Sequence, residues 1–249
     1  MGKYGDVHKI SDYIDHMSPF NFNTRGFVRK YVSYIAVDHT FLIHICGEKF
    51  AIFSIDELQY CYCCELGGAN LEMGFFTANN LYYEFLIDKK NNPSKILHYL
   101  SKYISGFEDA KSDPTEQTIV LENYGSVEQS GVTINHKELI LWKKEIASQN
   151  RKKIVSVNPI SQIIWCRQFE FGGGDNMDFS TLELYLVTGK TLTITASKGS
   201  GFERKWMLFQ LALQIKSKVP HLLYGPNDEY EKIFKKNPEE LLKLSKQKI

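Results

Sequence analysis

An internal repeat is the feature of this chain that most restricts its fold, because two copies of one pattern predict two units built alike. Eight residues that begin at Ile55 recur, with the same spacing, in a segment that begins at Ile160 and lies 105 residues further along. The first copy has Ile55, Leu58, Tyr60, Cys61, Glu65, Leu66, Gly67 and Gly68, and the second has Ile160, Ile163, Trp165, Cys166, Glu170, Phe171, Gly172 and Gly173. Every pair is identical or exchanges one apolar or aromatic residue for another. The sequence therefore predicts two similar units in tandem.

Runs of β-type residues flank both copies of the repeat. In the second unit, the alternating runs 182–187 and 191–195 are separated by Thr188-Gly189-Lys190, which is typical of a β-hairpin. Alternation with a period of two indicates a sheet with one face toward solvent. The other predicted strands are 41–45, 50–53 and 81–87 in the first unit, and 131–134, 139–142 and 154–157 in the second.

Each unit is predicted to end in a helix. After Pro93, apolar residues at 96, 97, 100, 103 and 104 fall on one side of a helix. The second unit has a helical stretch over 202–218, stopped by Pro220, in which Trp206, Phe209 and Leu213 are predicted to form a buried stripe.

These signals divide the chain into an N-terminal segment 1–26, a first unit 27–105, a polar linker 106–116, a second unit 117–224 and a helical tail 225–249. In the tail, Asn237 is the predicted N-cap of a helix that begins at Pro238.

The composition narrows the class of protein. The chain has 249 residues, 43% of them hydrophobic, and its 30 Lys and Arg against 29 Asp and Glu leave a net charge of +1. These values exclude a disordered chain and a globally basic nucleic-acid coat, so any electrostatic site must be local. The polar start and the short apolar runs predict neither secretion nor a transmembrane helix. The five cysteines, three of them crowded at 61, 63 and 64, favour a reducing, cytoplasmic setting.

The order of predicted elements resembles that of pleckstrin-homology-like domains and is most similar to their GRAM and bacterial branches. The second unit carries the resemblance through its hairpin, the Ile160-x-x-Ile163 step, a long strand, the Thr-Gly-Lys hairpin and a terminal helix with Trp206. The first unit resembles a more degenerate copy. The resemblance implies a mainly β (α+β) fold of two tandem bent-sheet barrels, each closed by a C-terminal helix. It also implies loops that bind proteins or lipid headgroups.

A local basic loop is the most suggestive polar feature. It contains Lys143, Lys144, Arg151, Lys152 and Lys153 between two predicted strands of the second unit. If the strands pair as a hairpin, these cations gather at one rim, where each gains about 1 kcal/mol beside an anionic membrane. A solvated loop is the alternative. The alternating basic residues that bind inositol phosphates on the first two strands of the family are not reproduced here.

Other candidates for chemistry fit structural roles better. The Gly172–Gly174 run lies between strands and lacks a following Lys-Ser/Thr, which favours a hairpin loop over a phosphate site. The crowded cysteines do not have zinc-ligand spacing, so we expect buried structural thiols. The seven histidines are scattered without catalytic partners. We therefore expect no catalytic, cofactor or metal site.

These observations predict a non-enzymatic intracellular module that binds a protein partner, through loops or by adding a strand to a sheet edge. A homodimer through an uncovered edge is a related prediction. One alternative is a lipid-headgroup-binding adaptor, peripheral at a membrane, that uses the basic loop. Another is an enzyme or metal protein whose site is assembled from distant residues. Nucleic acid is not an expected partner, because Trp142 is the one aromatic residue adjacent to the cations.

Overall fold

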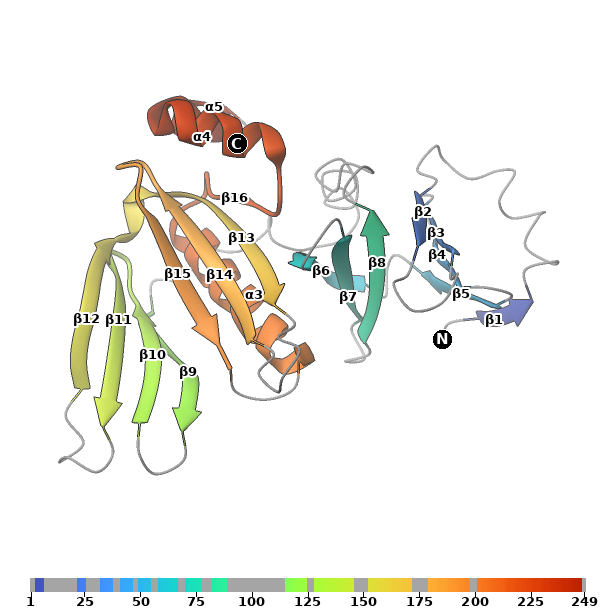
Figure 1. The fold of residues 1–249 in the computed structure, drawn as a ribbon, viewed down its shortest axis with the longest axis horizontal. Coiled ribbons are helices and arrows are strands. Elements are labelled where there is room, and N and C mark those ends of the chain that lie inside the picture. The colour runs from blue at the N-terminus through green and yellow to red at the C-terminus, as the bar shows by residue number, and fades with distance from the viewer. Residues whose placement is uncertain are drawn as a thin grey trace. The chain divides into compact units, whose positions relative to one another are not determined.

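The computed structural model describes residues 3–6, 22–25, 32–37, 41–46, 49–54, 58–66, 70–77, 82–88, 115–124, 128–145, 152–171, 179–197 and 201–247. The chain divides into two compact units, residues 1–107 and 108–249, and the division falls within the segment predicted as a linker. The described part is mainly β, with helices near the C-terminus (Figure 1).

Unit 1 contains two antiparallel arrangements of strands. The first is a sheet in the order β1-β5-β4-β3-β2, and β6, β7 and β8 form a meander. β1 pairs with β5 and β2 with β3, so the unit begins before residue 27. The helix predicted after Pro93 lies outside the described residues. The strands are β1 Lys3–Asp6, β2 Phe22–Arg25, β3 Val32–Val37, β4 Phe41–Cys46, β5 Lys49–Ser54, β6 Leu58–Leu66, β7 Asn70–Thr77 and β8 Tyr82–Asp88.

Unit 2 begins with a four-stranded antiparallel meander and continues with a three-stranded one. The elements are β9 Gln117–Tyr124, β10 Glu128–Ile134, β11 Glu138–Glu145, β12 Lys152–Pro159, the 3₁₀ turn η4 Ile160–Gln162, β13 Ile163–Phe171, β14 Phe179–Leu186 and β15 Thr191–Ala196. They are followed by α3 Gly201–Lys218, the short strand β16 Leu223–Tyr224 parallel to β13, α4 Asp228–Lys236 and α5 Pro238–Gln247.

The sequence repeat is also a structural repeat. β6 and β13 each have nine residues, and their first residues, Leu58 and Ile163, are 105 positions apart. Each strand opens its three-stranded meander with a register shift at the same place, between Leu58 and Tyr60 in β6 and between Ile163 and Trp165 in β13. A shared bulge at the same offset indicates that both copies bend the chain in the same way.

The predicted closure into barrels is not found in the described strands. The ladders of unit 2 leave β9–β12 as a sheet separate from β13–β15. The chain leaves β12 at Pro159, whose nitrogen has no hydrogen to donate, and η4 then turns it into β13. The two meanders of unit 2 are therefore distinct layers.

α3 covers one face of the β13–β15 meander. Its buried apolar residues are Leu208, Phe209, Leu211, Ala212 and Ile215, and positions 208, 211, 212 and 215 follow the i, i+3, i+4, i+7 spacing of an amphipathic helix. This stripe includes Phe209 but not Trp206 or Leu213, which are half-buried, so the predicted stripe was partly wrong. At the start of the helix, Glu170 of β13 lies 3.4 Å from the Lys205 ammonium and 3.8 Å from the Arg204 guanidinium.

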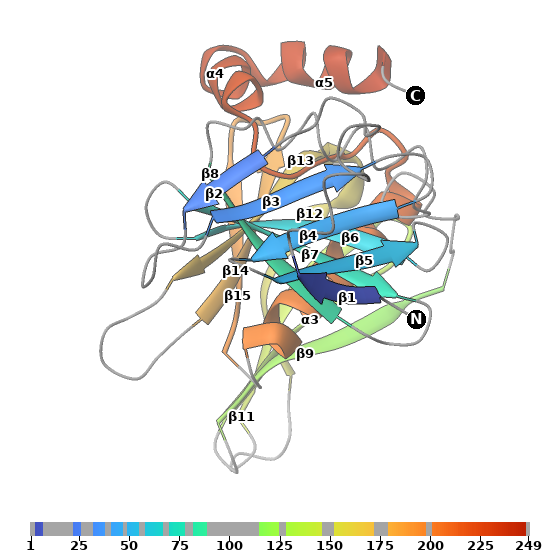
Figure 2. The same cartoon turned by 90° about the vertical axis from the view of Figure 1, so that its right-hand side faces the viewer.

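α4 and α5 pack on the opposite face of the meander. Arg167 of β13 and Glu183 of β14 are paired and face α4. The next pair, Gln168 and Leu182, faces α3. Gln168 donates a hydrogen bond to the Lys205 carbonyl of α3 at 2.9 Å. Alternate residues of a strand point to opposite faces, so the two helix layers sandwich the meander. Figure 2 shows α4 and α5 together and apart from α3.

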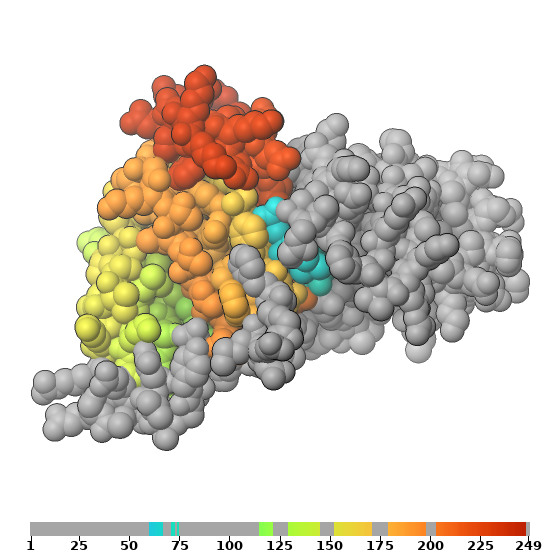
Figure 3. Space-filling model, viewed as in Figure 1, coloured from blue at the N-terminus to red at the C-terminus, as the bar shows by residue number. Residues whose placement is uncertain are grey.

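The tail helices are held by caps and by a buried aromatic cluster. Asn237 accepts from the Glu239 amide at 3.1 Å, which confirms the predicted cap of α5. Asn227 caps α4 in the same way, through the Glu229 and Tyr230 amides. Tyr230, Phe234 and Leu241 pack with the wholly buried Trp165. In the space-filling view the tail covers the end of the sheet (Figure 3).

We predict that Gly131→Ala destabilises unit 2 by roughly 1–3 kcal/mol, the usual cost of overpacking a filled site. A Cβ at Gly131 would overlap the ring of Trp142 on the neighbouring strand and lie 2.5 Å from the Ile119 carbonyl oxygen. Urea unfolding measures the loss. In a Trp142→Leu background the same change should cost less, because the ring no longer fills the space. An equal cost in both backgrounds would contradict the prediction.

Candidate functional site

The β11–β12 hairpin brings four of the five predicted basic residues together. Lys143 lies opposite Lys153, and Lys144 lies opposite Lys152. Directly opposite residues in an antiparallel pair have Cβ atoms about 4.5–5.5 Å apart, and like charges at that separation are unfavourable. Arg151 lies outside the described residues. The hairpin predicted from the sequence is confirmed, and its loop end is locally cationic.

The register partners of these lysines on the other side of β11 are uncharged. Ser130 lies opposite Lys143, and Gln129 lies opposite Lys144, both on β10. No acidic residue therefore occupies a directly opposite position in the ladder beside the lysine pairs. Further along the ladder, Glu122 lies opposite Ser130 and Glu128 lies opposite Glu145. Lys152 and Lys153, exposed on the terminal strand, are therefore the cations best placed to meet an anionic group from outside the sheet.

A β-bulge determines which side chains share the lysines' face. The pairing shifts between Leu141 and Trp142, so Val155 has no directly opposite partner, while Ser156 pairs with Leu141 and Ile154 with Trp142. Cross-strand partners project to the same face of a sheet. One face of the hairpin therefore carries Ile140, Trp142, Lys144, Lys152, Ile154 and Val157, and we call this set the β12 face.

The β12 face is apolar at one end and cationic at the other. Ile154, Val155 and Val157 are 60%, 54% and 46% exposed, and they are the large hydrophobic residues found exposed in the described part of the chain. The ring of Trp142 packs against Gly131, and the Lys152 ammonium lies 4.5 Å from the centre of that ring. This cation–π contact holds Lys152 at the junction between the apolar and cationic parts.

β12 is also the last strand of its sheet. The ladder order is β12-β11-β10-β9, and Figure 1 shows β12 at one side of that sheet. A terminal strand offers backbone N–H and C=O groups for pairing with another chain. The exposed apolar residues therefore coincide with exposed backbone hydrogen-bonding groups.

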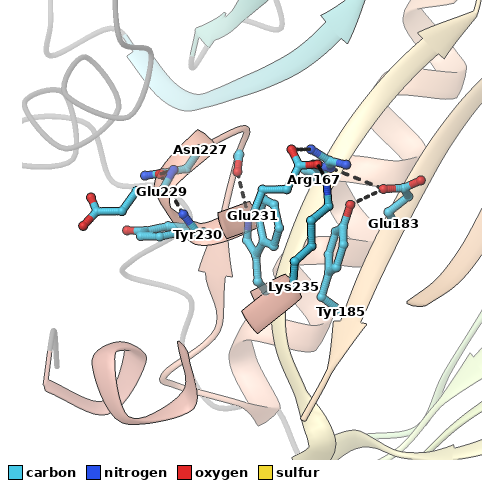
Figure 4. A network of polar contacts seen from close by, with 10 residues as sticks. Arg167, Glu183, Tyr185, Asn227, Glu229, Tyr230, Glu231 and Lys235 are labelled. Carbon is cyan, nitrogen blue, oxygen red and sulfur yellow. Dashed lines mark hydrogen bonds and ion pairs between the residues drawn. The ribbon is translucent and has the colours of Figure 1, made fainter. Parts of the chain in front are cut away.

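A second polar cluster surrounds Arg167 on the face of β13–β15 that α4 covers (Figure 4). Its guanidinium lies 3.3 Å from a Glu183 carboxylate oxygen and 3.1 Å from a Glu231 carboxylate oxygen. Tyr185 donates a hydrogen bond to Glu183, and Lys235 lies 2.6 Å from Glu231. The guanidinium bridges one carboxylate on the sheet and one on α4, so this cluster fastens the tail to unit 2.

The electrostatics of this cluster also indicate a structural role. The hydrogen bond from Lys235, with the nearby Arg167 charge, lowers the pKa of Glu231 although its partial burial opposes the shift. Burial, with the Glu183 hydrogen bond, raises the pKa of Tyr185. The open groove beside these residues encloses about 420 Å³ and is also lined by Thr191, Thr193 and Phe234. The guanidinium thus already has two carboxylate partners within unit 2.

The crowded cysteines of β6 are buried, as expected from the sequence. Cys61, Cys63 and Cys64 are at most 9% exposed and are present as thiols. Burial raises the pKa of the Cys61 thiol, which suppresses the reactive thiolate. Among the described residues, no group of three or more His, Cys, Asp or Glu side chains is placed to hold a metal ion.

Sequence reasoning found the lysines but missed the apolar half of the β12 face and the Arg167 cluster. The signal at β12 was the run Ile154-Val155-Ser156-Val157 beside a cationic loop. This run would place apolar residues on both faces of a strand. The signal at Arg167 was its place between Trp165 and Phe169 at spacings of two, which puts all three on one face of a strand. The guanidinium lies 4.5–5.1 Å from the centres of these two rings.

Comparison with known proteins finds no family model that matches this chain and no curated protein that matches it. Within the described ranges, no helix is long and apolar enough to cross a membrane. Two surfaces of unit 2, the β12 face and the surface around Arg167, are the candidates for a function. Arg167 is already engaged within the unit, whereas the apolar residues of β12 face solvent.

We predict that Arg167→Gln loosens α4 and α5, because the two carboxylates lose the cation that bridges them. The expected loss is roughly 1–3 kcal/mol, typical of hydrogen bonds to charged groups. Hydrogen exchange should accelerate in residues 228–247. Lys235→Gln is the matched control, because the Lys235 side chain is 72% exposed and its pair with Glu231 is a surface i, i+4 contact. Unchanged exchange in Arg167→Gln would contradict the proposed fastening role.

We also predict that stability falls as the pH drops below about 6.5, the ordinary pKa of histidine. Burial, followed by the positive charges of Lys246 and Lys216, lowers the pKa of His221 in the folded chain. Below pH 6.5 the unfolded chain therefore binds more protons than the folded chain, so acid favours unfolding. The stabilisation that is present above pH 6.5 is lost as the pH falls. Urea titrations at several pH values should show a smaller loss for His221→Gln than for the wild type. Identical pH slopes would contradict the assignment to His221.

Proposed function

We propose that this protein is a non-enzymatic interaction module that binds another protein along β12. The observation that carries the proposal is the coincidence of a terminal strand with solvent-exposed Ile154, Val155 and Val157. An extended segment added beside such a strand gains main-chain hydrogen bonds, and exposed side chains on the strand supply apolar contacts. Because strand addition needs both features, β12 is the best supported binding surface in unit 2.

The order of elements supports a binding module of the pleckstrin-homology-like kind. Unit 2 has four meander strands, three meander strands and a helix, and the described strands of unit 1 include the same four-and-three order in β2–β8. In this proposal the protein is a tandem of such units. Fold alone does not assign a ligand, so the partner is argued from β12 itself.

A photo-crosslinking amino acid tests the proposal in cells that express the full chain. We expect a discrete protein adduct when the crosslinker replaces Val155, which projects from the bulge and is 54% exposed. The adduct should disappear when Ile154→Thr and Val157→Thr are added, because threonine keeps the β-branched shape and removes the apolar contact. A crosslinker at the exposed Lys236 of α4 is the control position. Equal adducts at both positions would refute binding along β12.

A lipid-binding adaptor is the second candidate, and the lysine pairs Lys143–Lys153 and Lys144–Lys152 are the observation that favours it. Each cation near an anionic leaflet contributes about 1 kcal/mol, and salt screens this attraction. The candidate predicts that the protein floats with anionic but not neutral vesicles, at low salt only. It also predicts that a variant with all four lysines changed to Gln does not float. Absence of flotation by the wild type would exclude this candidate.

A further inference from the structure

We infer that the segment bound along β12 is an extended acidic peptide, with carboxylates beside the lysines and apolar side chains beside Ile154 and Val157. This inference rests on the proposed function and specifies the partner's chemistry. It uses the two halves of the β12 face together, since they lie on one strand and continue into each other.

Charge complementarity determines the acidic half. At the loop end, Lys152 and Lys153 project to opposite faces of β12, and each has another lysine directly opposite on β11. The next register partners, Gln129 and Ser130, are uncharged. Two consecutive acidic residues in an added strand would project to the same two faces and lie beside Lys152 and Lys153. Each carboxylate would then face one exposed lysine of the terminal strand.

The spacing along β12 determines the apolar half. Ile154 follows Lys152 by two residues on the same face, and the bulge at Val155 then brings Val157 onto that face. A bound strand has the same period of two. The peptide is therefore expected to carry an apolar residue two positions from an acidic one, and a second apolar residue further along.

A second copy of β12 fits this surface less well than an acidic peptide. If two β12 strands paired antiparallel about their centres, the lysines of each would lie near Asn158 and Pro159 of the other. Neither residue is anionic, and Pro159 has no N–H for the ladder. Parallel pairing would place lysine beside lysine. In both arrangements Lys152 and Lys153 receive no counter-charge from the second copy.

A membrane also fits less well, because of the order of residues along the hairpin. A hairpin that inserts into a bilayer needs apolar residues at its tip, ahead of the cations that remain at the headgroups. Here the exposed apolar residues follow the lysines, away from the tip. The sequence between β11 and β12, Ile146-Ala147-Ser148-Gln149-Asn150-Arg151, is mostly polar.

The test selects ligands for the intact protein from a yeast-displayed library of random ten-residue peptides. The best enriched peptide is then synthesised with a fluorescent label, and its binding is measured by anisotropy at 50 and 300 mM salt. We expect enrichment of paired Asp or Glu with Val, Ile or aromatic residues two positions away. The affinity for the wild type should fall at least tenfold between the two salt concentrations.

Three double variants separate the parts of the argument. Lys152→Gln/Lys153→Gln should weaken binding at least tenfold at low salt, as should Ile154→Thr/Val157→Thr. The charge-matched control Lys232→Gln/Lys236→Gln, on the exposed side of α4, should stay within twofold. Circular dichroism and urea unfolding confirm that each variant is folded.

Each other outcome contradicts a defined part of the proposal. Two outcomes would contradict the acidic partner but leave binding along β12 in place. In the first, the enriched peptides lack acidic residues. In the second, the lysine variant binds normally and the Ile154/Val157 variant does not. If neither variant weakens binding, or no peptide is enriched, both are wrong. Sedimentation that shows self-association dependent on Ile154 and Val157 would identify a second copy as the occupant. Lysine-dependent binding to anionic vesicles without peptide binding would identify a membrane surface.

Discussion

Trp165 is the residue on which the organisation of unit 2 depends. It is wholly buried at the bulge that opens β13, and its ring stacks on Tyr185 with centroids 4.2 Å apart. Its indole N–H donates to the Gly225 carbonyl at 2.8 Å, which ties the start of the tail to the sheet. Leaving this buried N–H unpaired would cost about 1–3 kcal/mol. One side chain therefore links the start of β13, the ring of Tyr185 and the segment from which α4 and α5 begin.

The position of Trp165 in the repeat explains why the repeat is visible in the sequence. Its counterpart is Tyr60, and the strands that carry them share length and bulge position. In each strand one residue, Ile164 or Gln59, is skipped in the pairing, and the aromatic residue that follows it pairs with the neighbouring strand. The exchange of tyrosine for tryptophan preserves a large aromatic ring, whereas the neighbouring loop sequences are free to differ.

The sequence predicted those features that local patterns determine. Period-two alternation located the strands at 139–142 and 182–187, and the Asn237-Pro238 pair located the start of α5. It did not reveal which residues of α3 are buried, because that depends on how the helix is rotated against the meander. It also could not show that Ile154 is exposed, since exposure depends on β12 being a terminal strand and on a bulge that shifts its pairing. Four of the five predicted basic residues were brought together because pairing across a hairpin is a local property.

The two meanders of unit 2 use their exposed surfaces differently, and this contrast bears on function. The face of β13–β15 opposite α3 would expose Trp165, Tyr185 and Arg167, but α4 and α5 cover it and supply a carboxylate to the guanidinium. Aromatic rings and arginine are the residue types most often found at binding hot spots, so an uncovered surface of this kind would compete for partners. Because the tail covers this face, Ile154, Val155 and Val157 are the large apolar side chains that the described part of the unit exposes. The C-terminal helices thus leave β12 as the exposed apolar surface on which the proposed binding rests.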